Sequence, residues 1–322
     1  MNDDSPYQLD GSAPVDAFPL TEVQESYYAA RALNGAGSTQ IHVEFDVDDL
    51  DIAKMEGAWN RLVSETDMLR VAVGNGGLQT VYRSVPVYRP ELVDLSDRSE
   101  SEQQAQLDRL REASRDHEFD PGVWPLFAIR VALLGGGRAR FFFAVDELAV
   151  DGPSLAILLQ QWYRRYRDDA PTGPLGITFH DYVLATRPTD QDIESALSYW
   201  KKKLVDAPLE QDAPFLAHPD GDARLRQRLR ASIEREDWAV LVDAARKAKA
   251  TPSALMLTLF TTAVEPDGLP LMLTTANRQP IHPDVRHLVG PFVSTSIFLA
   301  PGGDDSLRKR VQVVQRQLWR DL

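Results

Sequence analysis

The sequence predicts a mixed α/β (α+β) fold arranged as two lobes. The chain has 322 residues, more than one ordinary compact core accommodates. Alternating strand patterns and amphipathic helix patterns follow one another in both halves. A stretch rich in Asp, Pro and Gly at 168–176 separates the halves and has the composition of a linker. We therefore predict a flexible leader at 1–17, an N-terminal lobe at 18–170 and a C-terminal lobe at 171–322.

The helices of the first lobe are marked by their start signals. Thr21 and Gln24 have the spacing of a capping box. Asp51 precedes a helix whose apolar residues recur on one face. A polar helix is expected at 101–116, and Pro153 occupies the first turn of the next one.

Strands are expected where apolar and polar residues alternate between turn signals. The segment 41–47 has this pattern. The pairs 69–73 with 78–81, and 126–134 with 138–145, are separated by Gly-rich turns and are typical of hairpins.

The second half continues the same mixture. Its expected elements are a helix carrying Tyr199 and Trp200, a loop at 208–219, a strand at 225–233, helices from Asp237 and from Thr251, strands at 269–275 and 294–299, and a last helix near Ser306.

Composition excludes several functions. The chain has no cysteine, which removes disulfides, thiolate catalysis and cysteine-held metals. Its formal net charge of −13 argues against a nucleic-acid partner, since phosphates require clustered Lys and Arg. No apolar run is long enough to span a membrane, and the acidic N-terminus is unlike a secretory signal. We expect a cytoplasmic protein without a metal, because His282 and His287 lack a third ligand in view.

The candidate chemistry lies in the segment between a buried strand and a helix. Asp146, Glu147 and Asp151 occur there, and Ser154 follows in the first turn of the helix. Loops that join rigid elements often carry catalytic groups. Asp also favours a helix N-terminus through the helix dipole, so capping and catalysis are equally good explanations on pattern alone.

Five further stretches occur in an order typical of one family. They are 18–24 (FPLTEVQ), 67–70 (DMLR), 198–200 (SYW), 251–253 (TPS) and 277–290, which begins with Asn-Arg. With the acidic segment, they resemble the motifs of condensation-type domains of nonribosomal peptide synthetases. The two Asp separated by four residues resemble the heterocyclization subfamily, because ordinary condensation domains have two histidines where this chain has Asp and Glu.

The resemblance implies two chloramphenicol-acetyltransferase-like lobes in a V, with a tunnel for two phosphopantetheine arms. The arms belong to donor and acceptor carrier proteins, peptidyl or aryl, and adjacent synthetase domains are further implied partners. The domain needs no cofactor of its own. The amine of an acceptor Cys, Ser or Thr attacks the donor thioester. In heterocyclization domains the side-chain thiol or hydroxyl then closes a thiazoline or oxazoline ring with loss of water.

The resemblance also assigns roles to individual residues. Asp146, Glu147 and Asp151 are the predicted catalytic residues, with Asp146 or Glu147 nearer the substrates. We expect Asp151 to be chiefly structural and to pair with Arg278 from the other lobe. The residues expected to support the site are Ser154, Asn277, Arg278, Ser294 and Thr295.

Departures from the family pattern leave alternatives open. Pro291 and Val293 stand where heterocyclization domains usually have Asp and Thr, so the domain could condense without cyclizing. The family usually continues beyond the position of Leu322, so we expect a truncated chain with an incomplete second lobe. The alternative from another class is a noncatalytic domain that docks carrier proteins or another partner.

Overall fold

The computed structural model describes residues 17–34, 39–74, 76–169, 173–205, 207, 231–264, 270–302 and 305–321. Contacts divide the chain into two compact units. The first unit takes the described residues up to Arg187 together with Ala276–Ser294. The second unit takes the described residues of Pro188–Thr275 and Thr295–Leu322.

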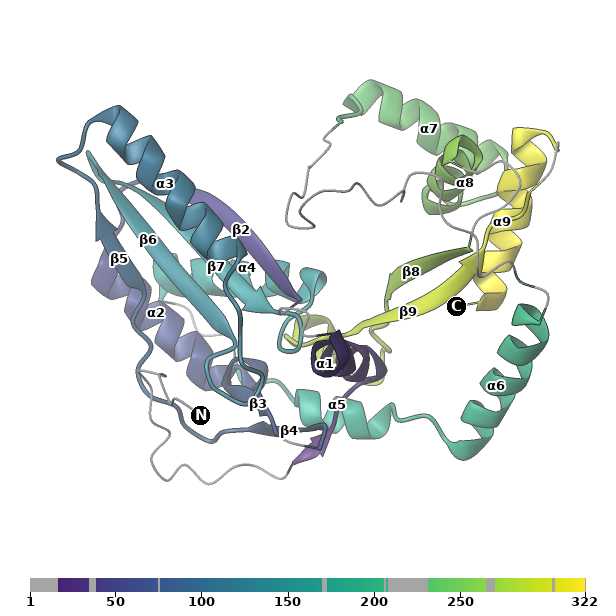
Figure 1. Ribbon diagram of the computed structural model, residues 1–322, viewed down its shortest axis with the longest axis horizontal. Coiled ribbons are helices and arrows are strands. Elements are labelled where there is room, and N and C mark those ends of the chain that lie inside the picture. Colours follow the sequence, from purple (N-terminus) through teal and green to yellow (C-terminus); the bar gives the residue numbers. More distant parts are fainter. Residues whose placement is uncertain are drawn as a thin grey trace. The chain divides into compact units, whose positions relative to one another are not determined.

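The first unit is built on a four-stranded sheet with the order β2-β7-β6-β5 (Figure 1). Its strands are β2 (Gln40–Val47), β5 (Glu91–Asp94), β6 (Phe127–Gly135) and β7 (Arg138–Asp146). The central strands β6 and β7 form an antiparallel hairpin, β2 pairs antiparallel with β7, and β5 lies parallel to β6. The predicted strands at 41–47, 126–134 and 138–145 are thus confirmed.

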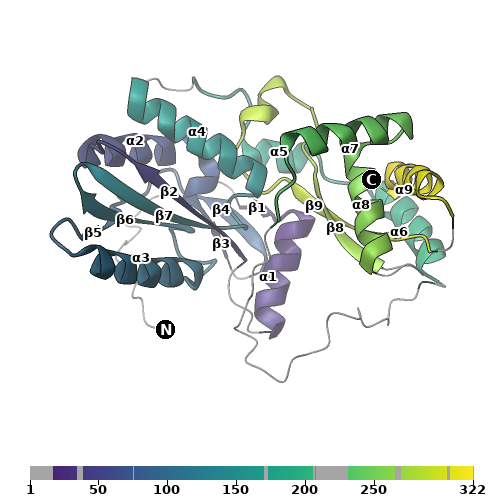
Figure 2. The same cartoon turned by 90° about the horizontal axis from the view of Figure 1, so that it is seen from above.

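Helices cover both faces of this sheet, as Figure 2 shows. They are α2 (Ile52–Glu65), α3 (Glu100–Arg115) and α4 (Gly152–Asp168). Along β7, Phe141 and Phe143 belong to the large core cluster that includes residues of α2 and α4, whereas Phe142 packs with α3. Successive residues of a strand point to opposite faces, so the continuous apolar run of β7 at 141–145 is explained by the cover on both of its faces.

Aromatic side chains form the centre of the larger core. Trp59 of α2 is fully buried, with ring centroids 5.0 Å from Phe127, 5.5 Å from Phe143 and 4.8 Å from Trp162. Asp51 caps α2 by accepting the amide of Lys54, as the sequence predicts.

A small sheet and helix α1 complete this part of the unit. The sheet has the order β1-β4-β3, and its strands are β1 (Phe18–Pro19), β3 (Val71–Val73) and β4 (Leu78–Val81). A 3₁₀ turn, η1 (Asp67–Arg70), precedes β3, and α1 (Glu22–Asn34) follows β1. The buried amides of Gln24 and Gln79 donate to each other at 2.9 Å, and Gln24 also donates to the Leu148 carbonyl at 2.7 Å. These bonds tie α1 to the loop after β7.

The segment Ala276–Ser294 returns to the first unit from far along the chain. It contains the 3₁₀ turn η2 (Pro283–His287) and packs beside α5 (Phe179–Ala185). A Cβ added to Gly290 would come within 2.5 Å of the Phe179 ring, so only glycine allows this close approach. The contact-based division therefore differs from the boundary expected near residue 170, because α5 and this returning segment pack on the core of the first unit.

The second unit contains four helices and a strand pair among its described residues. They are α6 (Asp190–Leu204), α7 (Arg235–Lys247), α8 (Pro252–Val264), α9 (Leu307–Asp321), β8 (Pro270–Ala276) and β9 (Val293–Leu299). The last residue of β8 and the first two residues of β9 belong to the segment assigned to the first unit. Its buried apolar residues form two small clusters around Phe298 and Leu255.

Most of the predicted elements are present. The hairpin of β3 and β4 and the polar helix α3 are confirmed. In the second half, the predicted helices correspond to α6, α7, α8 and α9, and two of the predicted strands correspond to β8 and β9. Several short elements were not predicted, among them β1, β5 and α5. The expected leader at 1–17, the loop at 208–219 and most of the strand at 225–233 lie outside the described residues, and 231–233 is not a strand. In the described part of the chain, no helix combines the length and the apolar sequence that crossing a bilayer requires.

Candidate active site

The acidic segment turns sharply between β7 and α4. The amides of Ala149 and Val150 both donate to the Asp146 carbonyl, at 3.0 and 3.1 Å. The Asp146 amide continues the sheet by donating to the Leu126 carbonyl at 2.9 Å. The turn is therefore fixed by backbone bonds, and its side chains project from a rigid frame.

Asp146 forms a buried ion pair with α1. Its side chain is fully buried, and Oδ1 accepts from Arg31 Nη2 at 2.7 Å and from the Leu148 amide at 2.8 Å. Oδ2 has no hydrogen-bond partner among the described residues, and neither do Nε and Nη1 of Arg31. Burial raises the pKa of Asp146, although the hydrogen bond and the charge of Arg31 act in the opposite direction.

Glu147 occupies a different environment from its neighbour. It is half-buried, and its amide donates to the Thr39 carbonyl at 2.9 Å. Burial raises the pKa of Glu147, the nearby Tyr27 side chain acts in the opposite direction, and the charges of Asp146 and Asp151 add to the rise. Burial and the Glu147 charge together raise the pKa of Tyr27 to about 12.

Asp151 and Ser154 hold the returning segment against the start of α4. Asp151 is buried and caps the helix, because Oδ1 accepts the Ser154 amide at 2.7 Å. Its other oxygen, Oδ2, accepts the Phe292 amide at 2.8 Å. The Ser154 hydroxyl donates to the Gly290 carbonyl at 2.6 Å and accepts the Gly290 amide at 3.1 Å. The capping interpretation of Asp151 is confirmed, but the partners of its carboxylate come from two distant parts of the chain.

The expected ion pair between Asp151 and Arg278 is wrong. Among the described residues, no salt bridge joins them: Arg278 Nη2 donates to the Ser154 hydroxyl at 2.6 Å, and Nη1 donates to the carbonyls of Val285 and Leu288. Backbone amides occupy both oxygens of Asp151, which leaves Ser154 as the link between the two charged groups. Both residues also belong to the first unit, so the pair does not join two lobes as expected.

The remaining support residues are less closely connected to this site. Asn277 is exposed and contributes its backbone, which donates to the Phe292 carbonyl at 3.0 Å and accepts the Tyr182 hydroxyl at 2.8 Å. Ser294 is half-buried on β9 at the end of the returning segment. Thr295 is exposed and already belongs to the second unit. The structure therefore brings Ser154, Arg278 and the Asn277 backbone together in the first unit.

Sequence reasoning missed the residues of α1 that face the acidic segment. Tyr27 and Arg31 are four residues apart and therefore lie on one side of the helix. Their spacing is a detectable signal, but nothing in the sequence connects α1 with a strand end more than a hundred residues later.

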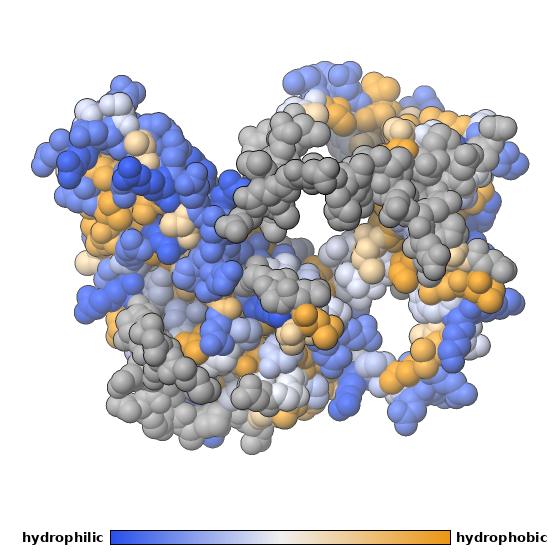
Figure 3. All heavy atoms as spheres, viewed as in Figure 1, coloured by the Kyte–Doolittle hydropathy of each residue, from blue (hydrophilic) through white to orange (hydrophobic). Residues whose placement is uncertain are grey.

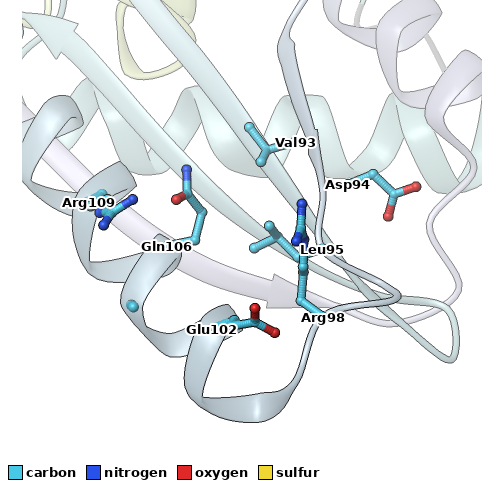
Figure 4. Close-up of a pocket in the computed structure, with 8 residues that line it drawn as sticks. Val93, Asp94, Leu95, Arg98, Glu102, Gln106 and Arg109 are labelled. Carbon is cyan, nitrogen blue, oxygen red and sulfur yellow. The ribbon is translucent and has the colours of Figure 1, made fainter.

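Two other kinds of site, a metal site and a groove, do not involve the predicted catalytic and support residues of the described chain. No group of three or more His, Asp or Glu in the described ranges is placed to hold a metal ion. A groove of about 440 Å³ lies between β5 and α3 (Figure 4). The residues lining it are Val93, Asp94, Leu95, Arg98, Glu102, Ala105, Gln106 and Arg109, which include none of the predicted site residues of the described chain.

Known proteins resemble this chain over nearly its whole length. It is 29% identical over 318 residues to pyochelin synthetase PchF of Pseudomonas aeruginosa, which covers 95% of this chain and 18% of the relative. It is 27% identical over 338 residues to phenyloxazoline synthase MbtB of Mycobacterium tuberculosis, covering 95% of this chain and 23% of the relative. The chain thus spans less than a quarter of the length of either relative.

A solved structure has the same fold. The EpoB NRPS cyclization-docking bidomain from Sorangium cellulosum superposes with a TM-score of 0.84 at 26% identity, covering 96% of this chain and 66% of that one. The family model described as Condensation domain matches residues 15–321. With the fold and the acidic segment after β7 in place, this match identifies the chain as a member of the condensation domain family.

Proposed function

We propose that this chain joins a carrier-bound acyl thioester to the amine of a carrier-bound Cys, Ser or Thr. The observation that carries the proposal is the family match over residues 15–321, which includes the acidic segment of Asp146, Glu147 and Asp151. The relatives PchF and MbtB, named as a synthetase and a synthase, support it.

The proposed reaction needs proton transfer but no redox chemistry. The amine nitrogen forms a bond to the acyl carbon while the carbon–sulfur bond of the thioester breaks. One proton leaves the nitrogen, and one is delivered to the departing sulfur, so an amide and a free phosphopantetheine thiol result. A carboxylate within hydrogen-bond reach of the nitrogen could carry this proton in both steps. The phosphopantetheine arms belong to the donor and acceptor carrier proteins, and the domain contributes no cofactor of its own.

Ring closure is the second candidate activity. The names phenyloxazoline synthase and cyclization-docking bidomain favour a thiazoline- or oxazoline-forming reaction after condensation. Pro291 and Val293 stand where that subfamily usually has Asp and Thr, so condensation is the step that we propose first.

Intact mass spectrometry of loaded carrier proteins tests both steps. The chain is mixed with a donor carrier bearing an acyl group and an acceptor carrier bearing Cys, Ser or Thr. Transfer of the acyl group to the acceptor supports condensation, and loss of one further water supports cyclization. An acceptor loaded with Ala is the matched control, because it allows condensation but offers no side-chain nucleophile. Binding of the carriers without transfer would contradict the proposed activity and indicate a docking module.

A further inference from the structure

Helix α3 leaves one edge of the large sheet uncovered. The helix packs mainly on the central strands β6 and β7, whereas β5 is the last strand of this sheet in the described chain. The groove of about 440 Å³ lies between β5 and α3. Its floor is apolar, because Leu95 is buried and Val93 is half-buried, and the facing residue of α3 is the small Ala105. The groove therefore has room for side chains from another segment.

The outer edge of β5 offers backbone groups for hydrogen bonding. The Leu95 amide donates to the Leu133 carbonyl of β6 at 2.8 Å. The backbone groups of successive residues in a strand point alternately to one neighbouring strand and to the other. Those of Val93 therefore point to β6, and those of Leu92 and Asp94 point to the open edge. An added strand can pair with this edge, as in β-strand addition.

Two arginines near the groove have no partner for their charge. Arg98 and Arg109 both line the groove (Figure 4), and neither guanidinium forms a hydrogen bond or a salt bridge with the described residues. The two carboxylates of the lining, Asp94 and Glu102, each accept hydrogen bonds from a nearby serine. The side chain of Asp94 also points away from the groove in Figure 4. The unpaired charges at the groove are thus positive, which complements an acidic partner.

The spacing of the two arginines matches an extended segment. The nine steps along α3 from Glu100 to Arg109 rise about 14 Å, and Arg98 lies just before the first turn. In a strand, residues i and i+4 lie on the same face and about 13 Å apart. Acidic residues at these two positions can each reach one arginine, and a residue at i+2 then lies above the apolar floor.

Two other occupants fit the groove less well. A second copy of this chain, with its β5 paired antiparallel in the centred register, would place Glu91 opposite Asp94 twice, and like charges directly opposite are destabilising. A small molecule would stay largely in water, because five of the eight lining residues are exposed, whereas small-molecule sites bury most of their ligand.

We propose that the groove between β5 and α3 binds an extended acidic segment of a partner protein, which adds to the sheet as a strand beside β5. The segment has acidic residues at i and i+4, which contact Arg98 and Arg109, and an apolar residue at i+2. This surface is separate from the acidic segment after β7, and the inference does not rest on the proposed condensation activity.

Fluorescence anisotropy with the full chain tests the charge and the spacing. The probe is a labelled peptide, acetyl-Thr-Glu-Thr-Val-Thr-Glu-Thr-amide, and its control, acetyl-Thr-Thr-Glu-Val-Glu-Thr-Thr-amide, has the same composition with the acidic residues too close. The probe should bind more tightly than the control. Arg98→Gln and Arg109→Gln should each weaken its binding by about 2–5-fold, as expected for exposed ion pairs. Arg83→Gln, which changes an exposed arginine outside the groove, should leave binding unchanged.

Methylated peptides and hydrogen exchange test the strand pairing. In an added strand, only every second amide faces β5. N-methylation of the Glu and Val residues of the probe, or of the Thr residues between them, should therefore block binding in one peptide and preserve it in the other. Binding of the probe should slow exchange of the Leu92 and Asp94 amides.

Several outcomes would overturn the proposal. Absence of binding at millimolar probe, or equal binding of the probe and its spacing control, excludes the acidic segment. Equal binding of the two methylated peptides excludes strand addition. Equal weakening by Arg83→Gln shows that the net charge of the chain, and not the groove, attracts the peptide. None of these measurements requires amide formation, so a chain without condensation activity still gives a result.

Discussion

The six tryptophans divide evenly between the two units, and their environments differ. Trp59, Trp124 and Trp162 of the first unit are 0%, 1% and 5% exposed, whereas Trp238 and Trp319 of the second unit are 40% and 74% exposed. Helix α6 of the second unit, which carries the other tryptophan, buries none of its residues. Figure 3 shows apolar residues at the surface over α6 and α7. The described second unit thus buries far less of its apolar surface.

The two units are therefore expected to differ in how much the packing of their side chains contributes to stability. The first unit has helices on both faces of its sheet, so removing a side chain there leaves a cavity that its neighbours cannot fill. The second unit has small clusters beside accessible surface, where neighbouring side chains can move into a gap. The acidic segment and the returning segment both belong to the first unit, which holds the candidate site on the better-packed frame.

The largest expected effect comes from truncating the central tryptophan. Trp59→Ala should lower the free energy of unfolding by about 3–5 kcal/mol, because its ring contacts three other aromatic residues. Phe298→Ala, an equally buried aromatic residue in the second unit, should cost less than about 3 kcal/mol. Urea unfolding followed by fluorescence measures both, and hydrogen exchange assigns each loss to a unit. Equal losses would break the distinction between the units.

A comparison of two helix caps gives the next largest effect. Asp151→Ala removes a cap and leaves the buried Phe292 amide without a partner, which should cost about 2–4 kcal/mol. Thr189→Ala removes the exposed capping box of α6 and should cost about 0.5–1 kcal/mol. Thermal and urea unfolding of both variants give the comparison. If Thr189→Ala lowers the free energy of unfolding as much as Asp151→Ala does, burial does not determine how much a helix cap stabilises this protein.

The smallest expected effect is a pH dependence of stability in the first unit. Burial lowers the pKa of His42 and of His117 below the value near 6.5 that the unfolded chain has. The unfolded state therefore binds more protons, so this stability is fully present above about pH 6.5 and is lost as the pH falls below it. Between pH 7 and pH 5.5, the melting temperature of the double variant His42→Gln, His117→Gln should fall by about 2–4 °C less than that of the unmodified protein. Parallel melting curves that keep the full pH dependence would point to other groups.

Local signals predicted most of the elements. Caps such as Asp51 and turns such as Gly135-Gly136-Gly137 act within a few residues, so the helices and hairpins that they mark are where the sequence places them. Short elements were not predicted, because a strand such as β5 (Glu91–Asp94) has too few residues to show an alternation of apolar and polar side chains.

The candidate site was predictable only in part. The acidic segment was recognised from its order along the chain, but its partners are set by tertiary contacts. The predicted pairing of Asp151 with Arg278 was wrong because the Phe292 backbone amide donates to the carboxylate instead. Such a backbone contact cannot be identified from the sequence. Tyr27 and Arg31 were overlooked for the same reason, since only the folded first unit brings α1 to the end of β7.

The return of Ala276–Ser294 to the first unit has a consequence for synthesis on the ribosome. The sheet, α4 and α5 can emerge and begin to pack once Arg187 has left the exit tunnel, but Phe292 and Gly290 emerge later. At about 5–20 residues per second, that interval lasts on the order of 5–20 s. During it the Asp151 carboxylate and the Ser154 hydroxyl lack their partners from this segment. A nascent chain stalled before Phe292 should therefore be digested by protease more readily than one released at full length.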